Sequence, residues 1–218
     1  MAKRLFERLK ADQWFFDMDG TVYSQIDGVY ERVLACYQEI VKERYRIDDP
    51  KDATNKLFEL KREHDVPLFW AGMVADGVPF EEIARRQAAA VSGVDLGIAP
   101  SSIRENNIRA AKGRRTILTN SPEPYARVIL ATLGVDHLFA ALIGVESMGQ
   151  GFVYKPQREA FAPLLEARRA GQQVVFVDDE LPNIFAVEEL DVGIVTVFVS
   201  PDPRLQARAP QYWVASLD

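Results

Sequence analysis

Five short apolar runs, each of strand length, constrain the fold of this chain more than any other feature. They fall at residues 13–17, 116–119, 141–145, 173–177 and 193–199. Most are rich in β-branched or aromatic residues and apolar almost throughout, which is typical of strands buried on both faces. Between them lie helical patterns, at residues 124–133, 156–170 and 182–190. This alternation predicts an α/β fold with a parallel sheet and right-handed crossovers.

The stretch between the first two runs is too long for a loop. It holds three further helical patterns, at residues 30–44, 52–64 and 80–91. We therefore expect a helical insert above the sheet, with hinges at residues 24–28 and 96–100. The predicted domains are a core made of residues 1–23 and 98–218 and an insert made of residues 24–97.

Composition narrows the classes of protein that this chain can belong to. The chain has 218 residues and a formal net charge of −6, whereas binders of nucleic acid polymers are usually basic. Its one cysteine, Cys36, excludes an internal disulfide and is interpreted as a small buried side chain. No run approaches the length of a transmembrane helix, and residues 1–10 indicate a short amphipathic helix rather than a secretory signal. We expect a cytoplasmic protein without membrane contacts; the oligomeric state is left open.

The strongest motif follows the first apolar run directly and reads Asp17-Met18-Asp19-Gly20-Thr21. Residues two apart at a strand end point to the same side, so Asp17 and Asp19 can converge on one ligand. The carboxyl ends of parallel strands are also where ligands bind in open α/β folds. Taken alone, the string can also be an ordinary turn rich in Asp and Gly.

Three other strand ends carry polar groups that could meet there. The second run ends at Thr119-Asn120, whose hydroxyl and backbone N–H can hold phosphate oxygens or simply cap a helix. Lys155 precedes Pro156 at the expected start of a helix, where it can reach a phosphate or remain solvated.

The fourth run ends in Asp178-Asp179, with Asn183 a turn further on. Adjacent buried carboxylates repel each other and need a cation or a proton. Mg²⁺, which prefers oxygen ligands, fits this requirement. The two acids can equally be turn residues that cap the next helix. Since all four sites fall at one edge of the predicted sheet, they are expected to form a single site.

The four motifs in this order resemble the haloacid dehalogenase superfamily. The resemblance covers residues 12–199 and implies a Rossmann-like parallel sheet sandwiched by helices, with an all-helical cap domain inserted. The strings Phe-Phe-Asp, Thr-Val-Tyr and Val-Asp-Asp-x-x-x-Asn are also similar to the pyrimidine 5′-nucleotidase-like branch. That branch often has Asn where Gly20 stands, so the chain departs from it there.

The resemblance implies a Mg²⁺-dependent phosphomonoester hydrolase with a role for each motif residue. Asp17 would be the nucleophile and form an aspartyl-phosphate, and Asp19 would be the general acid and base. Phosphate would be held by Gly20, Thr21, Thr119, Asn120 and Lys155. The ion would be held by Asp17, Asp19, Asp178 and Asp179, and Asn183 would orient the water molecules bound to the ion. The second carboxylate, Asp19, favours phosphate chemistry over dehalogenation, because a departing halide needs no proton.

The identity of the substrate does not follow from these motifs. Nucleoside 5′-monophosphates are the expected small phosphometabolites. Sugar-phosphate or phosphoglycolate-type phosphatases, a β-phosphoglucomutase-like phosphomutase and a catalytically silent binding module are the alternatives. The predicted insert offers candidate substrate-reading residues, namely Arg62, His64 and Trp70, each of which can also be an ordinary surface or core residue.

Overall fold

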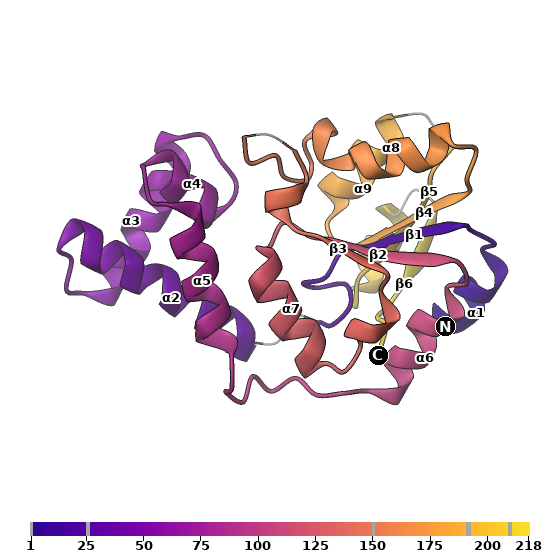
Figure 1. Cartoon of the computed structure of the whole chain (residues 1–218), viewed down its shortest axis with the longest axis horizontal. Coiled ribbons are helices and arrows are strands. Elements are labelled where there is room, and N and C mark those ends of the chain that lie inside the picture. The colour runs from indigo at the N-terminus through magenta and orange to yellow at the C-terminus, as the bar shows by residue number, and fades with distance from the viewer. Residues whose placement is uncertain (1, 25–26, 150, 191–192, 209–210) are drawn as a thin grey trace.

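A six-stranded, all-parallel sheet forms the centre of the molecule (Figure 1). The structure is a computed structural model that describes residues 2–24, 27–149, 151–190, 193–208 and 211–218. Its strands are β1 (Gln13–Phe16), β2 (Arg114–Leu118), β3 (Ala141–Ile143), β4 (Val174–Asp178), β5 (Val195–Val199) and β6 (Tyr212–Val214). Their order in the sheet is β3-β2-β1-β4-β5-β6. The predicted α/β class is confirmed.

Helices cover both faces of this sheet because the buried strands are apolar on both sides. The first layer holds α1 (Ala2–Arg8), α6 (Ser102–Ala110) and α7 (Glu123–Thr132), and the second holds α8 (Ala162–Arg169) and α9 (Leu181–Glu189) (Figure 1). Trp14 and Phe16 pack into the first layer, while Phe15 between them packs into the second. Because side chains alternate along a strand, β1 contributes to the hydrophobic cores on both faces of the sheet.

The order of the strands in the sheet determines where a ligand site can form. The chain runs outward from β1 to β2 and β3 and then returns to β4 on the other side of β1. Open α/β sheets bind ligands at such a reversal, outside the carboxyl ends of the strands. Phe16 is paired with Val177, and the Asp17 backbone N–H donates to the Val177 carbonyl at 2.8 Å. Asp17 and Asp178 therefore leave the sheet side by side.

Four of the five described helices between β1 and β2 form a separate group beside the sheet (Figure 1). They are α2 (Asp27–Tyr45), α3 (Pro50–Glu63), α4 (Phe69–Ala75) and α5 (Phe80–Val91). Their apolar sides pack together in one core, which Val145 and Tyr154 from the segment after β3 also join. The three expected helices are present, and α4 is an additional short one. Residues 25–26 of the expected entry hinge lie outside the described residues.

The segment after Lys155 differs from the prediction. A helix was expected from residue 156, but a turn comes first, in which the Gln157 N–H donates to the Tyr154 carbonyl at 2.9 Å. A 3₁₀ turn, η3 (Arg158–Phe161), follows, and α8 begins only at Ala162. Pro163 lies in the first turn of α8, where its missing N–H costs nothing.

The remaining short elements complete the core. Further 3₁₀ turns are η1 (Asp136–Leu138), η2 (Val145–Ser147) and η4 (Pro203–Arg208). The segment at residues 212–214 is the edge strand β6, parallel to β5. Cys36 is buried, as interpreted from its surroundings. Within the described ranges, no helix combines the length and the apolarity that crossing a membrane requires.

Candidate active site

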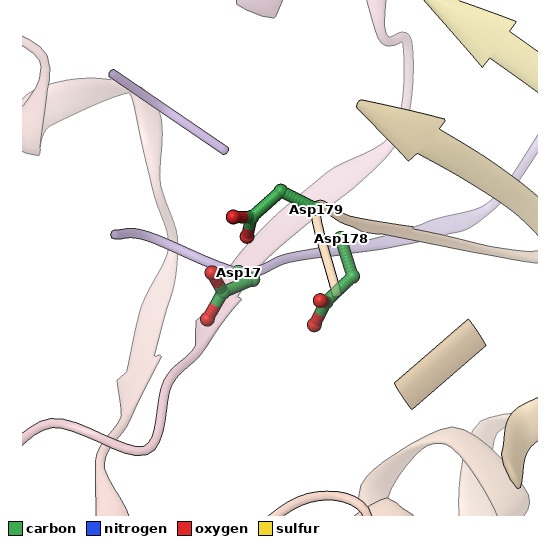
Figure 2. Close-up of side chains that lie close together, drawn as sticks. All are labelled: Asp17, Asp178 and Asp179. Atoms are coloured by element: carbon green, nitrogen blue, oxygen red, sulfur yellow. The ribbon is translucent and has the colours of Figure 1, made fainter. Parts of the chain in front are cut away.

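Three carboxylates meet at the carboxyl edge of the sheet (Figure 2). Asp17 follows β1, Asp178 ends β4 and Asp179 comes directly after it. One oxygen from each lies within 4.8 Å of the others. The predicted convergence of the first and fourth apolar runs on one point is therefore observed.

Lys155 is buried between two of these acids. Its Nζ lies 2.7 Å from Asp17 Oδ1 and 2.6 Å from Asp178 Oδ2, and its side chain is 1% exposed. Burial disfavours the charged form of this lysine, but the attraction of Asp17 and Asp178 is stronger in sum and raises its pKa. The sequence placed Lys155 near the start of a helix, whereas the turn at residues 154–157 delivers it into the sheet edge.

Asp178 has its hydrogen-bonding capacity largely occupied. The Glu180 N–H donates to its Oδ1 at 2.8 Å, and the Asn183 side-chain amide donates to Oδ1 at 3.0 Å and to Oδ2 at 3.1 Å. Lys155 also donates to Oδ2, so both oxygens of Asp178 accept hydrogen bonds. It orients Lys155 and the start of α9, and it has less capacity for a metal ion than Asp17 and Asp179.

Gly20 and Thr21 hold Asp179 in place. Gly20 has a φ of +89°, and a Cβ added to it would lie 2.0 Å from Asp179 Oδ2. Only glycine allows the carboxylate to approach so closely. The Thr21 hydroxyl donates to Asp179 Oδ1 at 3.0 Å. Both residues were expected to bind phosphate, and the structure brings them into contact with this carboxylate.

Asp19 lies beside the three-acid cluster and is held by hydroxyl groups. Its Oδ1 accepts from Tyr23 and, at 2.9 Å, from Tyr125, and its Oδ2 accepts from Ser121 at 2.7 Å. Burial, together with the nearby Asp19 carboxylate, raises the pKa of both tyrosines, which stay protonated as donors. Sequence reasoning missed both tyrosines. The four-residue spacing of Asp19 and Tyr23 was a usable signal, but nothing local marks Tyr125.

Thr119 and Asn120 connect β2 to the lysine segment. The Thr119 hydroxyl oxygen accepts from the Ser121 N–H at 3.1 Å, so its proton can be donated elsewhere. Asn120 binds the backbone of Lys155 twice, donating to its carbonyl at 2.9 Å and accepting from its N–H at 2.7 Å. The Asn120 side chain thus fixes the segment that carries the lysine.

Two acids of the cluster, Asp17 and Asp179, hold protons more tightly than ordinary aspartates do. Burial raises the pKa of Asp17 to about 7, with Lys155 opposing and Asp178 adding to the shift. Burial also raises the pKa of Asp179 to about 9, with repulsion from Asp17 and Asp178 adding to it. A divalent cation between these carboxylates would replace the protons.

The donor set fits Mg²⁺. The ion takes oxygen ligands at about 2.0–2.1 Å, so two of its ligands stand at most about 4 Å apart. The oxygens of the cluster lie within 4.8 Å of one another, close to that spacing. Asp17 Oδ2 and Asp179 Oδ2 have no hydrogen-bond partner in the described part of the chain, which leaves them to face an ion.

A cavity of about 600 Å³ opens between this edge of the sheet and the helical insert. Asp17, Asp19, Thr119, Asn120 and Lys155 line one end of it. This size is typical of sites for small organic ligands. The catalytic candidates that follow β1 and β2, together with Lys155 from the segment before α8, therefore face one common space.

The predicted substrate-reading residues have different surroundings. Trp70 lines the cavity, and it also packs in the core of the insert, with 4% of its surface exposed. Arg62 is exposed, and neither it nor His64 is among the described residues that line the cavity. His64 lies 3.7 Å from Asp76 instead. Lys61, the neighbour of Arg62, does reach the cavity.

The fold and the site define a protein of the α/β class with a parallel sheet and an acidic centre at the carboxyl edge of that sheet. A family model described as "haloacid dehalogenase-like hydrolase" matches residues 14–191. The chain therefore belongs to the haloacid dehalogenase-like hydrolases. The match is to the superfamily; the nucleotidase-like branch stays a prediction.

Solved structures with the same fold cover nearly the whole chain. A HAD phosphatase from Thermococcus onnurineus has 19% identity and a TM-score of 0.61, over 94% of each chain. CbbY from Rhodobacter sphaeroides, in complex with phosphate, has 15% identity and a TM-score of 0.59, over 95% of each chain.

The HAD-hydrolase YfnB from Bacillus subtilis, bound to magnesium, has 17% identity and a TM-score of 0.57, over 95% of this chain and 96% of its own. At these identities the likeness establishes the fold. A search of curated proteins found no significant match.

Proposed function

We propose that this protein is a Mg²⁺-dependent phosphomonoesterase that uses Asp17 as its nucleophile and acts on small phosphometabolites such as nucleoside 5′-monophosphates. One observation carries the proposal. Asp17 lies between the ammonium of Lys155, 2.7 Å away, and the carboxylate of Asp179, on the wall of a ligand-sized cavity. A carboxylate so placed can meet a phosphate while its negative charge is compensated.

The reaction proceeds in two displacements. An Asp17 oxygen forms a bond to phosphorus while the bond from phosphorus to the substrate oxygen breaks, and Asp19 gives that oxygen a proton. Asp19 then takes a proton from the water that attacks the aspartyl-phosphate, releasing inorganic phosphate and restoring Asp17. Thr119, the Asn120 N–H and Lys155 bind the phosphoryl oxygens, where charge accumulates.

Bound Mg²⁺ supplies positive charge that lowers the repulsion between the anionic nucleophile and the anionic substrate. Asp17, Asp179 and the backbone carbonyl of Asp19 would hold it. Asp178 and Asn183 keep Lys155 and the loop before α9 in position, as their hydrogen bonds indicate. Thr21 and Gly20 do the same for Asp179.

The helical insert, residues 24–97, is proposed as a cap domain over a core of residues 1–23 and 98–218. The packing of its four helices against one another supports this division. So does its contribution of one wall of the cavity. A cap in this place excludes water from the phosphate site and contacts the leaving group.

Phosphate release from a panel of monophosphates, with Mg²⁺ and with EDTA, tests the proposal. We expect release that requires Mg²⁺ and falls by roughly four orders of magnitude or more in Asp17→Asn, as is usual when a nucleophile is removed. Asp12→Asn, just before β1 and at the other end of that strand from the site, serves as the control. Retention of phosphate on a sugar would indicate a phosphomutase, and absence of turnover with every substrate would contradict an enzyme of either kind.

A further inference from the structure

The two ends of the cavity differ in chemistry. The end at the sheet is charged, whereas the end at the insert is mostly apolar. Helix α2 contributes Val29, Val33 and Tyr37, spaced four residues apart on one face, together with Tyr30. Residues 67–70 contribute the opposing apolar surface. The part of a substrate that lies beyond its phosphate would therefore contact an apolar wall.

The aromatic side chains of this wall are fixed by their neighbours. The rings of Tyr37 and Phe69 meet edge to face with centroids 6.3 Å apart. Trp70 packs against Phe80 at 5.7 Å and against Tyr154 at 5.8 Å. A wall held in this way is preorganised, so binding a flat ring against it orders few side chains.

A buried amide group interrupts the apolar wall. Gln87 of α5 is 3% exposed and lines the cavity. Its Oε1 accepts a hydrogen bond from the Tyr37 hydroxyl at 3.2 Å. Its Nε2 has no acceptor in the described part of the chain. An unpaired amide in an apolar cavity favours a ligand that brings the missing partner.

Positive charge is scarce at this end. Of the described residues that line the cavity, only Lys61 carries an ammonium apart from Lys155. Lys61 Nζ lies 4.9 Å from the centre of the Phe69 ring. A second phosphate on the substrate would have little to neutralise it, and a bare sugar would leave most of the wall without a matching partner.

Resting on the proposed function, we infer that the leaving group carries an aromatic ring with a hydrogen-bonding edge, as a nucleobase does, and that Gln87, oriented by Tyr37, reads this edge. The inference replaces Arg62 and His64 as specificity residues. It favours nucleoside monophosphates over phosphosugars, phosphoglycolate and bisphosphates.

Uridine and adenosine 5′-monophosphate, compared with ribose 5-phosphate, test this inference. All three release a primary alcohol of the same kind, and only the first two carry a base. We expect kcat/KM for the better nucleotide to exceed that for ribose 5-phosphate by about tenfold or more, the ratio that one good contact gives. Equal or faster hydrolysis of ribose 5-phosphate would overturn the inference and leave the phosphomonoesterase proposal standing.

Gln87→Met keeps the length of the side chain and removes the amide. We expect it to raise KM for the nucleotide about tenfold, with ribose 5-phosphate unaffected and kcat largely retained. Tyr37→Phe should likewise raise KM for the nucleotide relative to KM for ribose 5-phosphate. Gln38→Met, on α2 next to Tyr37 but outside the cavity lining, is the matched control. Equal effects of Gln87→Met on both substrates would refute a reading role.

Calorimetric binding to Asp17→Asn gives a result even if turnover is not observed. Tighter binding of the nucleotide than of ribose 5-phosphate, with the difference lost in Asp17→Asn/Gln87→Met, supports the inference. Equal affinities contradict it. Failure of the proposed function, by contrast, would appear as absence of phosphate release from every monophosphate by the wild-type protein.

Discussion

The hydroxyl of Tyr125 donates a 2.9 Å hydrogen bond to Oδ1 of Asp19. The two residues lie far apart in sequence, one on α7 and the other in the turn after β1. The same carboxylate also accepts from Tyr23 and Ser121. Because carboxylate torsions are soft, these three donors decide where the proposed acid and base stands.

We expect Tyr125→Phe to slow the enzyme in proportion to how poor the leaving group is. An alcohol must be protonated as it departs, whereas p-nitrophenolate departs without a proton. Loss of positioning should therefore lower kcat about tenfold or more for an alkyl phosphate and much less for p-nitrophenyl phosphate. Tyr212→Phe, on the edge strand, is the control. An equal loss on both substrates would indicate a general structural effect.

Lys155→Met should destabilise the metal-free protein. It leaves the carboxylates of Asp17 and Asp178 buried without their counter-charge, and breaking such a pair costs about 3–5 kcal/mol. Urea unfolding in EDTA measures the loss. Adding Asp178→Asn to Lys155→Met removes one of the two charges and should recover part of the stability. A double variant that is less stable than the single one would contradict this account.

Gly20→Ala should weaken Mg²⁺ binding about tenfold to a hundredfold, as loss of a group that positions a ligand usually does. The added Cβ would overlap the Asp179 carboxylate, 2.0 Å away, and displace it. Gly93→Ala is the matched control, since Gly93 also has a positive φ, +69°, but nothing lies within 4 Å of its added Cβ. The dependence of the thermal unfolding temperature on Mg²⁺ concentration measures the Mg²⁺ affinity of each variant. Equal affinities in the two variants would show that backbone strain alone is at work.

Without metal, the protein should become less stable as the pH rises from about 4 towards 9. The pKa of Asp17 is raised to about 7 and that of Asp179 to about 9, while an unfolded aspartate titrates near 3.9. Between these values the folded state binds more protons than the unfolded state, so the free energy of unfolding falls with increasing pH. Mg²⁺ competes with the protons, and its stabilising effect should therefore grow with pH.

Thermal unfolding in EDTA and in Mg²⁺ at several pH values measures this dependence. Asp179→Asn, which cannot ionise at that position, should show a flatter profile in EDTA. Stability in EDTA that increases across this pH range would contradict the assignment of a proton-holding acid cluster.

The local pattern of apolar residues was sufficient to predict most of the fold. The apolar runs became strands of the parallel sheet, because buried parallel strands need apolar side chains on both faces. The start of α8 was mispredicted. Pro156 is a plausible first helical residue by composition, but the hydrogen bonds of residues 154–157 form a turn that directs Lys155 inward. No local propensity encodes that contact, since its partners come from β1 and β4.

The residues of the candidate site likewise include some that the sequence predicted and others that it did not. Asp17, Asp19, Asp178 and Asp179 stand at the ends of recognisable apolar runs, and Lys155 stands before the Pro of an expected helix, so position along the chain was enough to name them. The assignment of cap residues was less successful. Neither Arg62 nor His64 lines the cavity, because the face that a helix turns to its neighbours depends on packing against elements far away in sequence.

The amino-acid sequence by itself determined the α/β class, the inserted helices and the acids at the sheet edge, because periodicity and strand-end position are local properties. The tertiary structure decided that three hydroxyls hold Asp19, that Gly20 makes room for Asp179 and that Gln87 interrupts an apolar wall. These relationships join residues from separate elements. They exist only once hydrophobic burial has brought those elements together.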